Sequence, residues 1–180
     1  MSKLIDEVLR FFENDRWRYQ PLNSAPRRAK TTNNSGAGEP SFTPHRFDEE
    51  TSIVQTWFSG NSGQWNCFAQ ERVDASQLIF YSIFPVNVPP ETRHAAAEFI
   101  TRANYAMNIG NFEMDYDDGH VRFKTSIDVK GELITETMIR QLIYLNVLTM
   151  DRYLPGLMRV IYGGILPSEA VAEIENSLVE

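Results

Sequence analysis

The side chains best suited to chemistry in this sequence are three aspartates, Asp115, Asp117 and Asp118, which surround one short turn. Carboxylates spaced in this way are similar to the start of an EF-hand calcium loop. That loop also needs a glycine at its sixth position and a bidentate glutamate at its twelfth. Counted from Asp115, Gly119 stands at the fifth position and Ser126 at the twelfth. The spacing therefore excludes an EF-hand, and we predict no metal site.

The other potentially reactive groups are scattered along the chain. The histidines, His45, His94 and His120, show no metal-ligand spacing with Cys67. Cys67 alternates with apolar residues in a strand pattern, which is typical of a small core residue rather than a nucleophile. The sequence has no P-loop and no glycine-rich dinucleotide motif. We therefore predict no catalytic residue and no cofactor, and we expect that the protein is not an enzyme.

Charge is distributed unevenly over the 180 residues, whose net charge is −7. Residues 1–46 hold 8 Lys and Arg against 5 Asp and Glu, whereas residues 47–180 hold 9 against 19. An acidic body repels phosphate groups, so nucleic acid is not an expected partner. We interpret the basic cluster Arg27, Arg28 and Lys30 as part of a solubilising tether, although it would also suit an acidic partner.

Cysteine content and hydropathy indicate a location for the protein. A single cysteine allows no internal disulfide, which fits a reducing compartment. Residues 1–13 mix apolar and charged side chains and do not form a signal peptide. The longest apolar-rich run, residues 142–150, is far shorter than the roughly 20 residues that span a bilayer. We therefore predict a cytoplasmic protein without membrane insertion.

Sequence patterns divide the chain into three parts. Apolar residues at helical spacing predict a helix over residues 3–14, and a short strand follows before Pro21. We expect residues 1–20 to dock on the body of the protein. Residues 21–46 are rich in Ser, Asn, Gly and Pro, which predicts a flexible linker. Residues 47–180 are expected to form one domain.

This domain is predicted to be of the α+β class, with an antiparallel sheet of about five strands flanked by helices. Apolar patterning indicates strands over residues 53–58, 64–72 and 78–84. The third is apolar on both faces, as expected of a central strand. A hairpin over residues 112–125 supplies two more strands. Helices are expected to begin near Pro89, Glu136 and Leu166.

Turn geometry predicts a register for the hairpin. Asp118-Gly119 fits a two-residue type I′ turn, in which both central residues have positive φ. Glu113 would then pair with Lys124, and the apolar side chains of both strands would share one face.

Two residues just before the hairpin complete an expected structural motif with Asp118 and Gly119. Asn104 lies near the end of the preceding helix, where its amide is expected to hydrogen-bond the incoming backbone. Gly110 stands where a left-handed helix cap is expected.

The helix predicted over residues 136–162 is apolar on more than one face. A small sheet with few helices does not easily cover such a helix, so we expect part of it, or a sheet face, to meet a second copy. The alternative is that the terminal helices cover it within one chain. The expected interface residues are Leu142, Leu145, Leu148 and Met150. If a ligand pocket lies between the sheet and this helix, Tyr144 and Tyr153 are expected to line it.

A resemblance to the YbjN family, in particular to its cyanobacterial branch, is carried by the segment RANYAMNIGNFEMDYDDGHVRFKTSIDV. The upstream strands and the later MDRYLPGLMRVIYGG also match, so the resemblance covers about residues 50–165. It implies a small α/β protein with the fold of type III secretion chaperones, usually a homodimer. It also implies a sensory-transduction or stress-related regulatory role, and it offers no catalytic residue to carry over.

Two hypotheses for function follow. The first is a non-enzymatic protein-interaction module, chaperone-like or regulatory, that forms a homodimer and binds an unidentified protein. The second is a sensory regulator that binds a small molecule between the sheet and the long helix.

Overall fold

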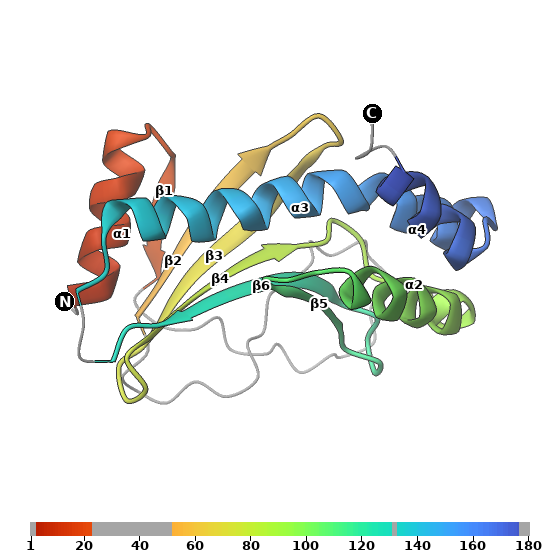
Figure 1. Cartoon of the computed structure of the whole chain (residues 1–180), viewed down its shortest axis with the longest axis horizontal. Coiled ribbons are helices and arrows are strands. Elements are labelled where there is room, and N and C mark those ends of the chain that lie inside the picture. The colour runs from red at the N-terminus through yellow and green to blue at the C-terminus, as the bar shows by residue number, and fades with distance from the viewer. Residues whose placement is uncertain (1–2, 23–51, 131–132, 177–180) are drawn as a thin grey trace, which may run out of the picture.

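The computed structural model describes residues 3–22, 52–130 and 133–176, and in these ranges one antiparallel sheet of six strands carries four α-helices (Figure 1). The predicted linker lies outside the described residues, apart from Pro21 and Leu22. The strand order is β1-β2-β3-β4-β6-β5. The elements in chain order are α1 (Lys3–Asn14), β1 (Tyr19–Leu22), β2 (Ser52–Ser59), β3 (Gln64–Arg72), β4 (Gln77–Ile83), η1 (Pro90–Thr92), α2 (Arg93–Tyr105), β5 (Asn111–Met114), β6 (Val121–Asp128), α3 (Glu136–Gly163) and α4 (Pro167–Asn176).

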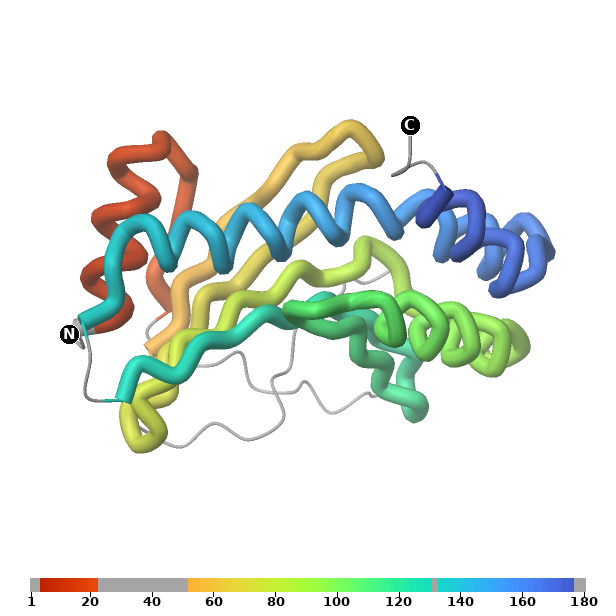
Figure 2. Tube along the Cα trace, viewed as in Figure 1, coloured from red at the N-terminus to blue at the C-terminus, as the bar shows by residue number. Residues whose placement is uncertain are grey.

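The predicted α+β class is confirmed, and a short N-terminal strand joins the sheet as its sixth strand, β1. Pro21 was predicted to end this strand, but β1 runs through Pro21 to Leu22, because a proline is tolerated on an edge strand. The helices gather on one face of the sheet, where α3 lies across the strands with α1 beside one end and α2 and α4 beside the other (Figures 1 and 2). The main core fills the space between helices and sheet. β4 pairs with β3 and β6 and is buried on both faces, as predicted for the central strand. The opposite face of the sheet carries a smaller apolar cluster of Ile53, Phe68, Ile79, Tyr81 and Ile83.

Most apolar side chains of α3 are buried within a single chain. Leu142 and Met150, two of the expected interface residues, are 7% and 0% exposed and belong to the main core. The sheet lies beneath α3 while α1 and α4 pack against its two ends, so the terminal helices cover most of the apolar surface that the sequence shows. Leu148 is different, because it stays 53% exposed.

A carboxylate on α3 holds the turn between β2 and β3. Asp151 accepts hydrogen bonds from the backbone N–H groups of Ser62 (2.7 Å) and Asn61 (3.0 Å). The Ser62 hydroxyl donates in return to the carbonyl oxygen of Asp151 (2.7 Å). A Cβ added to Gly60 would stand 2.3 Å from the carboxylate, so the close approach requires glycine there. Hydrogen bonds to a charged acceptor are strong, and these fix α3 to the end of the sheet.

A buried amide fastens the middle of α3 to the centre of the sheet. Asn146 is fully buried, and its Nδ2 donates to the carbonyl oxygens of Phe80 in β4 (3.0 Å) and Phe123 in β6 (3.2 Å). The Thr125 hydroxyl accepts from the same nitrogen (3.2 Å) and donates to the carbonyl oxygen of Leu142 (3.1 Å). Buried polar groups that lose such partners are costly. The position of α3 over β4 and β6 is therefore specified.

The turn between β5 and β6 is longer than the two residues predicted. The N–H of Asp115 donates to the carbonyl oxygen of His120 (2.8 Å), so residues 116–119 form the turn. The N–H of Gly119, at φ 76°, donates to the carbonyl oxygen of Asp115 (2.8 Å). Asp118 also accepts from the N–H of His120 (2.8 Å). Aspartate side chains that bond the backbone two residues on stabilise this wider turn.

The strand pairing of the hairpin shifts with its turn. Glu113 faces Arg122 instead of Lys124, so the predicted register was wrong by two positions. Phe112 faces Phe123, and their rings lie 4.7 Å apart. Because a shift of two keeps every side chain on its own face, the apolar face of the hairpin is still the predicted one.

Asn104 makes the predicted contact with the incoming strand. Its Oδ1 accepts from the N–H of Phe112 (2.8 Å), and its Nδ2 donates to the carbonyl oxygen of the same residue (3.0 Å). α2 ends at Tyr105, so Gly110 is not the cap of this helix. Gly110 has a left-handed φ of 79° in the loop before β5, where a Cβ would stand 2.7 Å from the Phe123 ring.

We expect Asp151→Ala to lower the free energy of unfolding by about 2 kcal/mol, because two backbone N–H groups of the turn lose a charged acceptor. Urea unfolding measures this change. The matched control Asp74→Ala removes an exposed carboxylate that pairs with Arg72 and should cost less than about 0.5 kcal/mol. Equal losses in the two variants would contradict an anchoring role for Asp151.

Candidate functional site: the hairpin cleft and the outer face of α3

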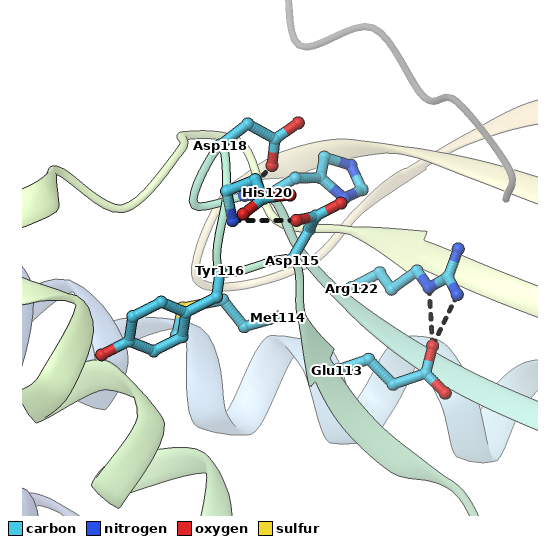
Figure 3. A pocket seen from close by; sticks show the side chains of 8 residues that line it. Glu113, Met114, Asp115, Tyr116, Asp118, His120 and Arg122 are labelled. Carbon is cyan, nitrogen blue, oxygen red and sulfur yellow. Dashed lines mark hydrogen bonds and ion pairs between the residues drawn. The ribbon is translucent and has the colours of Figure 1, made fainter.

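A cleft of about 360 Å³ lies beside the β5–β6 hairpin (Figure 3). Both strands and the turn between them contribute side chains to this cleft. The acidic segment that contains Asp115, Asp117 and Asp118 therefore lines a depression in the surface. Figure 3 shows the pair of Glu113 and Arg122 on one side of the hairpin and Tyr116 on the other. The lining residues are Glu113, Met114, Asp115, Tyr116, Asp117, Asp118, His120 and Arg122.

The hairpin itself engages two of the aspartates in this cleft. Asp115 Oδ1 accepts from the N–H of Asp117 (2.9 Å), and Asp118 Oδ1 accepts from the N–H of His120 (2.8 Å). Side chains in such bonds shape the turn. The residues that first suggested a calcium loop thus have structural contacts, consistent with their failure to match its spacing.

Arg93, at the start of α2, ties this turn to the helical layer. Its guanidinium donates to the carbonyl oxygens of Val88 (3.2 Å), Tyr116 (3.0 Å) and Asp117 (3.3 Å). The ring of His94, one of the three scattered histidines, packs edge-on against Tyr116 at 5.8 Å. These contacts fix the wall of the cleft.

Glu113 is the charged centre of the strand pair. It accepts from Arg122 Nε (2.7 Å) and also pairs with Lys124. Burial acts to raise the pKa of Glu113, but hydrogen bonds from Lys124 and Arg122, with their positive charges, together hold it below its usual value. Arg122 in turn lies over the Tyr81 ring, 4.7 Å from the ring centre. The carboxylate is therefore committed to an ion-pair network.

The described ranges place no three His, Cys, Asp or Glu side chains where they could hold a metal ion. Cys67 is fully buried, and burial raises the pKa of its thiol to about 12, although contacts with Ser82 and Trp65 act to lower it. A thiol with such a pKa is not an activated nucleophile. The absence of catalysis stays a prediction.

The two tyrosines expected to line a common pocket lie in separate surroundings. Tyr144 donates to the Asp15 carboxylate (2.8 Å), whereas Tyr153 packs against Phe99 and Phe112. Nine residues of helix separate the two, or about 13 Å along the axis. Burial acts to raise the pKa of Asp15, but hydrogen bonds from Tyr144 and Arg140 lower it below its usual value. Tyr144 thus helps to join α1 to α3.

One side of α3 faces away from the sheet. Leu145 is half-buried, while Leu148, Arg152 and Pro155 are exposed. Spacings of three and four residues place all four on one stripe of the helix, which we call the outer α3 face. Figure 1 shows no other described element over this side of α3. Of the expected interface residues, Leu148 therefore remains accessible, whereas Leu145 is half-buried and also packs against the main core.

Comparison with known proteins supplies a family. The YbjN family model, described as "Putative bacterial sensory transduction regulator", matches residues 42–158. No curated protein and no solved structure matched the chain. The expected likeness to the type III secretion chaperone fold therefore stays a prediction. In the described ranges, no helix has the length and apolar character needed to cross a membrane.

We expect Glu113→Gln to lower the free energy of unfolding by about 1 kcal/mol at neutral pH, because an ion-paired carboxylate is lost. The folded-state pKa of Glu113 lies below its unfolded value, so its contribution is present above that unfolded value and is lost as pH falls through the folded one. The difference from wild type should therefore shrink in acid. Urea unfolding between about pH 3 and 7 measures it.

The control for this series is Glu98→Gln, which removes an exposed partner of Arg102. Its unfolding free energy should stay close to that of wild type at each pH. A loss in Glu113→Gln that stays constant from neutral to acid pH would contradict the ionic role of Glu113.

Proposed function

The chain belongs to the YbjN family, and we propose that it is a regulatory protein-interaction module, chaperone-like and without catalysis, that acts as a homodimer. The family description supports regulation in general terms, and the finer assignment rests on the outer α3 face. This proposal retains the first of the two hypotheses raised by the sequence.

The observation that carries the proposal is the 53% exposure of Leu148, an apolar residue on a helix whose sheet-facing side is buried. Leu148 lies near the middle of α3, between the regions where α1 and α4 pack. A two-fold axis near this residue would bring the outer α3 faces of two copies together, so that each copy covers the same patch of the other. Burying a leucine in this way contributes about 1.5–3 kcal/mol. A specific interface buries on the order of 800 Å² per partner, so neighbouring surface would also contribute.

Packing beneath α3 favours an interaction surface over a small-molecule pocket. The side chains that α3 directs to the sheet include Asn146, Val147 and Met150, and each is fully buried. The side-chain amide of Asn146 also donates hydrogen bonds to the backbone of the sheet. The burial of these side chains against the sheet supports an interaction surface over the ligand pocket of the sensor hypothesis.

We expect wild-type protein to elute as a dimer, with twice the 20.7 kDa mass of the chain, in size-exclusion chromatography with light scattering. Leu148→Arg should convert it to a folded monomer, because an arginine would be buried without a partner in the interface. The matched control Val73→Arg changes another exposed apolar residue, in the β3–β4 turn, and should remain dimeric. A monomeric wild type, or a dimeric Leu148→Arg variant, would contradict the dimer proposal.

Partner capture tests the interaction role separately. We expect tagged wild-type protein, purified from its native host under several growth conditions, to enrich the same protein partner by mass spectrometry. An unfolded sample, made by mild denaturation of the same tagged chain, controls for capture by exposed apolar surface. Failure to enrich any partner over this control in every condition would count against an interaction module.

A further inference from the structure

An open groove of about 640 Å³ lies at the corner where α1 leads into β1. The pairing of β1 with β2 stops at Tyr19 and Thr56, whereas β2 continues along β3 to the pair of Ser59 and Gln64. The last three residues of β2 therefore extend past the end of β1, and residues 15–18 line a groove with them. We call this feature the corner groove, and its main lining residues are Arg16, Trp17, Arg18, Trp57 and Phe58.

The corner groove contains two arginines that form no ion pair with other described residues of the chain. In the described part of the chain, neither Arg16 nor Arg18 has a side-chain ion pair or hydrogen bond, and both are exposed. The one carboxylate lining the groove, Asp15, already accepts from Arg140 (2.9 Å) and Tyr144 (2.8 Å). Two guanidinium groups are thus available to an incoming anion.

The backbone conformation at position 16 favours glycine, so an arginine at this position does not stabilise the local fold. The N–H of Trp17 donates to the carbonyl oxygen of Phe12 (2.8 Å) and that of Arg16 to Glu13 (3.3 Å), which is the Schellman pattern of a helix end. Arg16 occupies its left-handed position, at φ 59°. Glycine is preferred there, because a Cβ is strained in this conformation. The local fold alone would favour glycine.

Aromatic side chains form the rest of the corner groove. Trp57 is 37% exposed and lines the groove, so part of its ring is open to an incoming side chain. Trp17 stacks on Phe12 at 5.5 Å and packs against Phe58 at 5.6 Å on the face of the sheet that carries the helices. Trp57 is the neighbour of Phe58 in β2, so its side chain points to the opposite face, at the open edge of the strand. Trp and Arg are the residues most enriched at the energetic centres of protein interfaces.

We propose that the corner groove binds an acidic segment of a partner protein. Carboxylates of the segment pair with Arg16 and Arg18, and one of its apolar side chains packs on Trp57. Guanidinium groups match carboxylates in charge and geometry. A protein segment is favoured over nucleic acid, because a chain of net charge −7 repels an extended polyanion more strongly than a short peptide with few charges. This site does not depend on the dimer proposed above.

Fluorescence anisotropy with the full chain tests the proposal. The probe is a labelled pentapeptide with acidic residues on both sides of a central phenylalanine, and its control replaces every Asp and Glu by Asn and Gln. We expect saturable binding of the acidic peptide and at least about tenfold weaker binding of the neutral one. Added salt should weaken the acidic peptide only.

Two variants separate binding from folding. Arg16→Gly should weaken the acidic peptide at least about fivefold while the thermal midpoint stays the same or rises, because glycine suits the left-handed position. Arg18→Gln should weaken it similarly. Arg102→Gln removes the same charge from α2, at the far end of the helical layer from α1 (Figure 1), and should leave binding unchanged.

The proposal is overturned by any of four results. The first is that the acidic and neutral peptides bind equally well, and the second is that Arg16→Gly binds the acidic peptide as tightly as wild type. The third is that binding does not saturate at millimolar peptide. The fourth is that a single-stranded oligonucleotide binds more tightly than the acidic peptide.

Discussion

The docking of α3 on the sheet is the constraint on which the rest of the structure depends. Two polar side chains of this helix are buried and find their partners outside it. Asn146 donates to the backbone of β4 and β6, and Asp151 accepts from the turn between β2 and β3. The two anchors lie more than a turn apart and reach different strands, so α3 can neither roll nor slide without breaking one of them. An apolar contact alone specifies position less strictly.

This docking decides which surfaces remain for binding. With the anchors directed inward, Leu148 is directed outward on the same helix. α1 is held against α3 by the contact of Asp15 with Arg140 and Tyr144, which places the end of α1, and with it residues 16–18, beside the open end of β2. The outer α3 face and the corner groove are therefore both consequences of how the helical layer is fixed to the sheet.

The sequence predicted those features of the fold that depend on one local pattern, such as hydrophobic periodicity or the position of a polar residue at a helix end. The α+β class and the contact of Asn104 with the next strand are examples. The hairpin register failed because Asp118 bonds the backbone and favours a wider turn than its glycine neighbour suggested. Asp151 gave no signal, since its partners are backbone groups about 90 residues earlier. The corner groove was missed for a related reason. Arg16 and Trp57 line one groove only because β2 extends past the end of β1, and no local sequence pattern predicts that difference in length.

The most direct measurement of the account is disulfide cross-linking at the outer α3 face. Cys67 is buried with a raised pKa, so a cysteine introduced on the surface would react alone. Mild oxidation of Leu148→Cys should give a covalent dimer on a non-reducing gel, because residues beside a two-fold axis come within disulfide reach. Val73→Cys should stay monomeric on the same gel. No cross-link from Leu148→Cys, or equal cross-linking of both variants, would contradict the account.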